Sequence, residues 1–166
     1  MRCWSSTGVA LCVAANDQGD TSLRAVPDGA GGAIAAWDDF RSGTNHDLYA
    51  QRVLSGGATS WAANGVVLCD AVDSQVGVEL IADGAGGAIA AWNDLRSGTN
   101  YDIYAQRVVS NGAMAWASDG VLVSAAAANQ SEAGLASDGS GGAIIAWEDT
   151  RNGATSDVYA QRVVAG

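Results

Sequence analysis

The stretch DGAGGAIAAWNDLRSGTNYDIYAQRVV, which runs from Asp83 to Val109, decides the fold because the chain carries it three times. The other copies are DGAGGAIAAWDDFRSGTNHDLYAQRVL, which begins at Asp28, and DGSGGAIIAWEDTRNGATSDVYAQRVV, which begins at Asp138. The copies recur every 55 residues in a chain of 166. An internal period of this length indicates a repeat architecture, in which each unit buries its apolar surface against its neighbours.

Each repeat has the pattern of four short β-strands. In the second copy, apolar runs at 78–82 and 88–92 flank DGAGG, whose glycines suit a tight hairpin turn. Further strands are expected at 103–109 and 120–124, and no segment shows a sustained helical period of apolar residues. Four antiparallel strands at a period near 50 are typical of a propeller blade. We therefore predict an all-β fold, a β-propeller made of three 55-residue blades.

The repeat resembles the sialidase-like, BNR-type family of propeller repeats, above all the DGxGGxIxAWxDxRxG…DIYAQRV repeats of large secreted bacterial proteins. In that family a turn called the Asp-box, SxDxGxxW, joins the third and fourth strands. The segments at 55–61 (SGGATSW) and 110–116 (SNGAMAW) keep its Ser, Gly and Trp but lack its Asp. The resemblance implies a propeller fold and an extracellular, bacterial setting, although no signal peptide is recognisable in this chain.

We interpret residues 1–166 as a single propeller segment. Residues 1–13 match the end of a repeat and are expected to form a fourth strand that lacks the first three strands of its blade. Residues 20–69 and 75–124 form the first and second blades, and residues 130–166 supply the first three strands of the third.

Three blades are too few for a closed ring, because propellers use four to eight. An open array would leave the faces of its two end blades bare. We therefore predict a homodimer with a six-bladed ring, in which the N-terminal strand of each chain completes the third blade of its partner in a Velcro-type closure. The competing interpretation is that the chain is a fragment of a longer propeller.

The charge of the chain is strongly acidic. Eight arginines and no lysines face 18 carboxylates, which gives a net charge of −10. Such a surface repels phosphate groups, so neither nucleic acid nor a membrane is expected as a partner. No cofactor is predicted.

No metal site is predicted either. Cys12 and Cys69 occupy equivalent positions, with Ser124 in the third repeat, as small buried residues would. Cys3 has no counterpart, and no Cys/His cluster suggests zinc. The NDQGD segment at 16–20 has some oxygen ligands of a calcium loop but not their EF-hand spacing, so a solvated turn is the preferred interpretation.

Residues that occur once in every repeat are expected to be structural, because an active site needs one constellation rather than three copies. We predict that the repeated tryptophans pack between blades and that each WxDxR motif forms an Asp–Arg ion pair. A second ion pair is expected between Asp47 and Arg52 and their equivalents. The predicted structural residues are Trp37, Trp92, Trp147, Asp39, Asp94, Asp149, Arg41, Arg96 and Arg151.

Recognition is expected on the loops that differ among the repeats. In an up-and-down sheet the loops at 42–47, 97–102 and 152–157 emerge at the same end as those at 13–21, 70–75 and 125–130. Variation on one rim over a constant scaffold is typical of a repeat protein that binds a ligand. The candidate ligand-binding residues are Asn45, His46, Asn100, Tyr101, Asp73 and Gln75.

The sequence thus predicts a non-catalytic binding or scaffold module that holds a carbohydrate or a protein through this rim, with no catalytic residue assigned. One alternative is a sialidase-like glycoside hydrolase, for which His46 and Tyr101 are the best unrepeated candidates. A purely structural repeat array without a ligand is the other.

Overall fold

A computed structural model of the chain describes residues 4–153 and 155–165; Cys3, singled out above, lies outside them. All of the regular secondary structure in these residues is β-strand, and none of it is a helix that could span a membrane. The strands are β1 (Gln18–Pro27), β2 (Ala33–Asp39), β3 (Asp47–Val53), β4 (Val66–Cys69), β5 (Gln75–Ala82), β6 (Ala88–Asp94), β7 (Asp102–Val108), β8 (Val121–Ser124), β9 (Gln130–Ser137), β10 (Ala143–Asp149) and β11 (Asp157–Val163).

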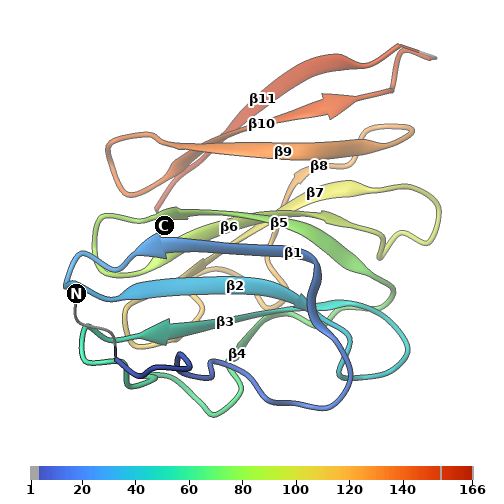
Figure 1. Cartoon of the computed structure of the whole chain (residues 1–166). Coiled ribbons are helices and arrows are strands. Elements are labelled where there is room, and N and C mark those ends of the chain that lie inside the picture. Colours follow the sequence, from blue (N-terminus) through green and yellow to red (C-terminus); the bar gives the residue numbers. More distant parts are fainter. Residues whose placement is uncertain (1–3, 154, 166) are drawn as a thin grey trace.

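The strands form three antiparallel sheets, one for each repeat, and we call each sheet a blade. The first blade has the order β1-β2-β3-β4, the second β5-β6-β7-β8 and the third β9-β10-β11. The blades stack in sequence order from the first, blue to green at the bottom of Figure 1, to the third, orange to red at the top. The predicted all-β repeat fold is therefore confirmed. The three blades do not close on themselves.

The DGAGG turn is built by its aspartate and its glycines. Asp28 Oδ1 accepts hydrogen bonds of 2.8 Å from the backbone N–H groups of Ala30 and Gly32. A Cβ atom at Gly32 would lie 2.2 Å from the carbonyl oxygen of Val53, so only glycine fits there. Asp83 and Asp138 organise the two equivalent turns in the same way.

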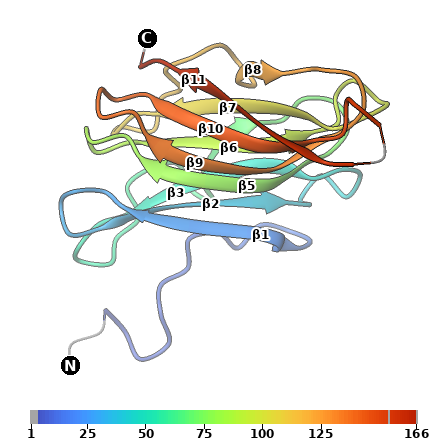
Figure 2. The ribbon, with the colours of Figure 1, turned by 90° about the horizontal axis from the view of Figure 1, so that it is seen from above.

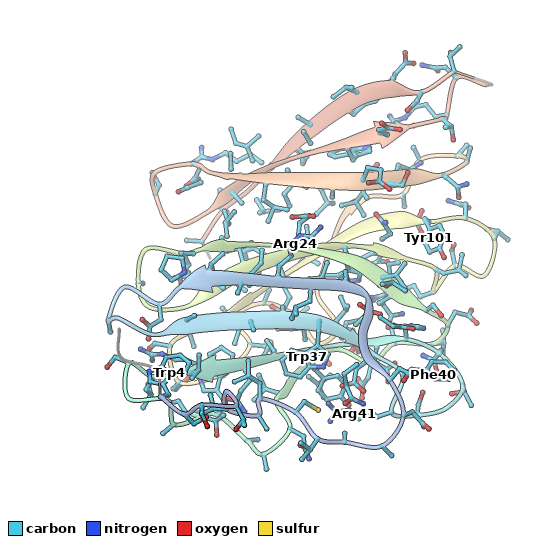
Figure 3. The ribbon with its side chains drawn as sticks, viewed as in Figure 1. Trp4, Arg24, Trp37, Phe40, Arg41 and Tyr101 are labelled. Atoms are coloured by element: carbon cyan, nitrogen blue, oxygen red, sulfur yellow. The ribbon has the colours of Figure 1, made fainter. Side chains whose placement is uncertain are left out.

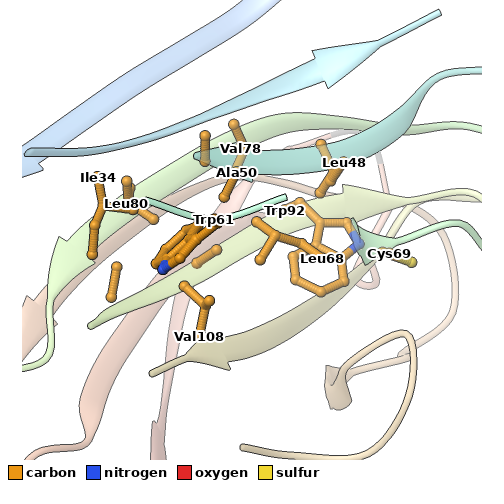
Figure 4. Packing of buried hydrophobic residues seen from close by; sticks show 13 residues of the cluster. Ile34, Leu48, Ala50, Trp61, Leu68, Cys69, Val78, Leu80, Trp92 and Val108 are labelled. Carbon is orange, nitrogen blue, oxygen red and sulfur yellow. The ribbon is translucent and has the colours of Figure 1, made fainter. Parts of the chain in front are cut away.

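Two apolar cores lie between the blades, because alternate residues of each strand face opposite neighbours. Trp92 and Ala90 of β6 pack with Ile34 and Leu48 of the first blade, as Figure 4 shows for the labelled members of this core. Ile89, the neighbour of Ala90, belongs to the other core, which the second and third blades share. Figure 2 shows the stacked sheets from above, with β1, β5 and β9, the first strands, in neighbouring positions.

Residues 4–17 contain no strand, although a fourth strand was predicted within residues 1–13. The segment nevertheless contacts the first blade as a fourth strand contacts the blade that follows it. Cys12 Sγ lies 3.9 Å from Asp39 Oδ2, as Cys69 Sγ lies 3.9 Å from Asp94 Oδ2. Trp4 Nε1 donates to the carbonyl of Ser55, as Trp61 Nε1 donates to that of Ser110. The ladder is missing because no third strand of the same blade lies beside the segment.

The third blade has the opposite deficit, since no fourth strand covers β11 in the described part of the chain. Leu48 and Ile103 pair with residues of β4 and β8 and are 0% exposed. Val158, the equivalent residue of β11, is 79% exposed. The outer face of the third blade is therefore bare apolar sheet.

Candidate functional site

The WxDxR motif forms a closed network of contacts in every blade. Trp37 Nε1 donates a 2.8 Å hydrogen bond to Asp39 Oδ2, and Arg41 Nε donates one of 2.8 Å to Asp39 Oδ1. The Arg41 guanidinium also lies 3.5 Å above the ring of Tyr49. Burial raises the pKa of Asp39, but the hydrogen bonds from Arg41 and Trp37 outweigh it and leave the pKa below its usual range. The carboxylate therefore stays charged, and both of its oxygens accept hydrogen bonds.

The other two blades repeat the network. Trp92 and Trp147 donate to Asp94 and Asp149, which also bind Arg96 and Arg151. Arg96 Nη2 reaches in addition the thiol of Cys69 on the preceding blade, at 3.1 Å. Arg151 Nη2 makes the equivalent contact with Ser124 Oγ of the second blade, at 3.5 Å. The predicted Asp–Arg pairs thus exist within each blade, and their arginines also reach the blade before.

The second set of arginines does not pair with the aspartates that the sequence suggested. Arg52 binds Asp28, the aspartate of the hairpin turn, with 2.8 Å between Nη2 and Oδ2, and not Asp47. The reason is that Arg52 and Asp28 lie at the same end of the sheet, whereas Asp47 starts β3 at the other end. Arg52 Nη1 donates to the carbonyl of Ser110 in the next blade at 3.0 Å. This ion pair therefore joins one blade to the next.

The variable loops gather at one end of the stacked blades, as the sequence analysis expected. The His46 carbonyl accepts a 2.8 Å hydrogen bond from Gln75 N, and the Tyr101 carbonyl accepts one of 2.8 Å from Gln130 N. The loop between β2 and β3 and the loop between β6 and β7 therefore each touch the segment that leads into the next blade. Phe40 and Tyr101 mark this rim in Figure 3, and Trp4 lies at the opposite end.

Three of the candidate rim residues use their side-chain amides inside the protein. Asn45 Nδ2 donates to the carbonyl of Asp73, and Asn100 Nδ2 donates to the carbonyl of Ala128, each at 2.8 Å across a blade boundary. Gln75 is fully buried, and its Nε2 donates to three carbonyls of the loop before it. These amides fix the loops in place. The side chain of Asp73 is exposed and open to a ligand.

His46 and Tyr101 are anchored through their backbones rather than through their side chains. Tyr101 N donates to Asn129 Oδ1 at 3.0 Å, and its ring is half-buried at the rim. The His46 ring lies against Phe40, with 4.9 Å between the ring centroids, and beside the carboxylates of Asp20 and Asp38.

A cavity of about 380 Å³ lies where the first strands of the three blades come together. Arg24 of β1 crosses it to Glu79 of β5, with 2.6 Å between Nη2 and Oε1. Figure 3 shows Arg24 at this boundary between β1 and β5. The lining residues are Thr21, Ser22, Arg24, Gly77, Glu79, Asn93, Glu132, Ala133 and Gly134.

Variation among the loops does not indicate this cavity, because its lining residues lie on strands. The signal was present in the first strands, where Arg24, Glu79 and Gly134 occupy one repeat position and differ in charge. Strand positions that vary in this way mark a surface that packing does not constrain.

Comparisons with family models, with curated proteins and with solved structures found no match to this chain. The resemblance to sialidase-like repeats therefore remains an expectation from the motif.

Proposed function

We propose that the chain is a non-catalytic binding module, in which a constant scaffold of stacked blades presents a variable rim and inner cavity to a ligand, with a carbohydrate favoured over a protein. The observation that carries the proposal is that repeated and unrepeated residues have different surroundings. The repeated Trp, Asp and Arg side chains are occupied by contacts with one another. The residues that differ among blades, such as His46, Tyr101 and Arg24, lie at the rim or in the cavity.

A carbohydrate suits this surface because sugars combine apolar ring faces with many hydroxyl groups. Tyr101 offers an aromatic face at the rim, and Glu79 and Glu132 offer acceptors in the cavity. The hydrolase alternative needs one pair of carboxyl groups that flank a sugar at a defined separation of about 5 to 10 Å. The buried aspartates of the WxDxR motif are bound by arginine, which speaks against this role for them.

The test is an array of immobilised glycans probed with the wild type and with His46→Ser and Tyr101→Ser. The third blade has Ser156 at this position, and both residues are anchored through their backbones, so the fold is expected to survive. We expect the wild type to bind a set of glycans and the variants to lose at least about 10-fold in affinity. A blank array for the wild type would favour the purely structural alternative.

The same proposal includes a closed six-bladed homodimer. The Ile144 face of the third blade corresponds to the Ile34 face of the first blade, which packs against the second. Ile34 is 0% exposed and Ile144 is 45% exposed. The first blade offers the complementary face, on which Leu23 is 58% exposed, whereas the equivalent Val78 is 0% exposed. In the proposed dimer these two bare faces pack against one another as neighbouring blades do.

The segment at 8–12 completes this fit. Its sequence, GVALC, matches GVVLC at 65–69, which contains β4. In the proposed ring, this segment of one chain pairs with β11 of the other and covers Val158. Two copies would supply six blades, within the usual range of four to eight.

Light scattering of the purified chain tests the closure. We expect the mass of a dimer for the wild type and that of a monomer for Val158→Asp, since a charge cannot be buried unpaired at a blade interface. Val72→Asp is the matched control, because Val72 is similarly exposed, at 71%, but lies on a loop. A folded wild-type monomer at high concentration would exclude the ring.

A further inference from the structure

One histidine and two aspartates meet at the rim end of the first blade. Asp20 lies on β1, Asp38 on β2 and His46 just before β3. One ring nitrogen of His46 and one oxygen of each carboxylate all lie within 4.8 Å of one another. Imidazole and carboxylate are common ligands of zinc and of related divalent ions.

The Asp38 carboxylate is held rigidly. Its side chain is 0% exposed, and its Oδ2 accepts a 3.1 Å hydrogen bond from Thr21 N. Ser22 donates to its Oδ1 from both the backbone N–H and the hydroxyl, the latter at 3.0 Å. The Ser22 hydroxyl in turn accepts a hydrogen bond from Val78 N in the second blade. Such outer contacts are what orients a carboxylate ligand before an ion arrives.

His46 is held equally well but lacks a partner for its ring. The side chain is only 16% exposed, and it lies against Phe40. Its Nε2 is 3.8 Å from Asp20 Oδ2, and its Nδ1 is 3.7 Å from Asp38 Oδ2. Both distances exceed that of a hydrogen bond. The Nδ1 atom is buried without a hydrogen-bond partner among the described residues, and a buried polar atom in this state normally has an additional partner.

The cluster occurs in the first blade alone among the three. At the positions of Asp38 and His46 the second blade has Asn93 and Tyr101, and the third has Glu148 and Ser156. In the third blade the hydroxyl of Ser156 simply donates to Glu148 at 3.2 Å. Asp20 lies where the register of β1 is irregular, between Gln18 and Leu23. This strand has 10 residues, whereas the equivalent β5 has 8. Two local changes, a longer strand and a single histidine, therefore converge on one point.

The electrostatics of the cluster favour a cation. The carboxylates of Asp20 and Asp38 lie on either side of the His46 ring and carry a formal charge of about −2, which a divalent ion balances.

We propose that Asp20, Asp38 and His46 form a binding site for a divalent transition-metal ion such as Zn²⁺. Asp38 and His46 form the fixed wall of the site, and Asp20, whose side chain is 43% exposed, closes it from the solvent side. A tetrahedral ion with ligand bonds of about 2.0 to 2.2 Å places its donors roughly 3.4 Å apart. The donor atoms, which lie within 4.8 Å of one another, must therefore approach by up to about 1.4 Å. An exposed aspartate can make this movement by changing its rotamer. The fourth position is left to water or to a ligand at the rim.

The histidine gives a direct readout because the chain contains only one. The full chain is treated with a chelator, dialysed and titrated with ZnCl₂, while the imidazole resonances are followed by NMR and the heat by calorimetry. We expect one Zn²⁺ per chain, with the His46 resonances shifting in step with the heat. Ca²⁺ and Mg²⁺ are expected to leave the resonances in place, because these ions prefer oxygen ligands.

Two variants test these ligands. The first replaces His46 by the residue of the second blade, and the other replaces Asp20 by its neutral isostere. His46→Tyr and Asp20→Asn are each expected to weaken Zn²⁺ binding about 100-fold. Asp73→Asn, which removes an exposed rim carboxylate outside the cluster, is expected to bind as the wild type does. Asp20 is half-exposed, so its variant is expected to fold even if His46→Tyr does not.

Unshifted imidazole resonances at saturating Zn²⁺, or equal affinity in Asp20→Asn, would overturn the proposal. Reading the glycan array both with and without a chelator separates glycan binding from metal binding at this site.

Discussion

The second and third blades share the same repeat motifs, yet they differ in how much of each motif is buried. Ile103 and Val158 occupy the same repeat position, but Ile103 is 0% exposed and Val158 is 79% exposed. Ile89 and Ile144 differ in the same direction, with 0% and 45% exposure. The second blade lies between two neighbours, whereas the third has one. In a repeat protein, therefore, the contribution of a residue to stability depends on the neighbouring repeats as much as on its own repeat.

The largest expected difference concerns truncation at this position. Ile103→Ala should lower the free energy of unfolding by about 3 kcal/mol, because it leaves a cavity in a packed core. Val158→Ala should change it by less than about 0.5 kcal/mol where the chain is monomeric. Urea unfolding monitored by tryptophan fluorescence measures both. Equal losses of unfolding free energy for the two variants at low protein concentration would contradict this expectation. A loss for Val158→Ala that grows with protein concentration would support ring closure.

An intermediate difference is expected for the turn aspartates. In the second blade Asp83 and Arg107 have side chains that are 0% and 15% exposed, but in the third blade Arg162, the partner of Asp138, is 54% exposed. Asp83→Ala should therefore cost on the order of 2 kcal/mol at pH 7. Asp138→Ala should cost less, because solvent screens its ion pair. Urea unfolding at neutral pH compares the two.

The pH dependence provides the control for this prediction. Burial raises the pKa of Asp83, but hydrogen bonds from Ala85 N, Gly87 N and Arg107 outweigh it, and the net pKa lies below its usual range. A lowered carboxyl pKa stabilises the fold above the unfolded value of about 3.9, and this contribution disappears as the pH falls through the folded pKa. The loss caused by Asp83→Ala should therefore shrink between about pH 5 and pH 2. A loss that is independent of pH would contradict the role of the charge.

The smallest expected effect separates two equivalent thiols. Cys69 is fully buried between the first two blades, and burial raises the pKa of its thiol to about 12. Cys12 makes the same contact with an arginine but belongs to the N-terminal segment, and it is half-buried. In a Cys3→Ser background, a thiol reagent should modify Cys12 at least about 10-fold faster than Cys69. Similar rates would mean that the segment at 8–12 is covered as well as β4 is.

Much of the fold follows from the sequence because its determinants are local and occur three times. The 55-residue period, the alternating apolar strands and the DGAGG turn predict three repeated antiparallel sheets. The turn is a clear case, since Asp28 binds backbone N–H groups only two and four residues away. Repetition also identified the WxDxR residues as structural partners before any contact was visible. These features need no information from distant parts of the chain.

The tertiary structure decided what depends on residues far apart in sequence. It paired Arg52 with Asp28 rather than Asp47, because the strand directions bring the ends of β3 and the hairpin turn together. It left residues 8–12 without a ladder, because a strand needs a neighbour to bond to. It also brought Asp20, Asp38 and His46 together through an irregular β1 that no periodicity indicates. The sequence by itself determined the repeated unit, and only the packing of the units determined which side chains meet, which faces stay bare and where a ligand has room.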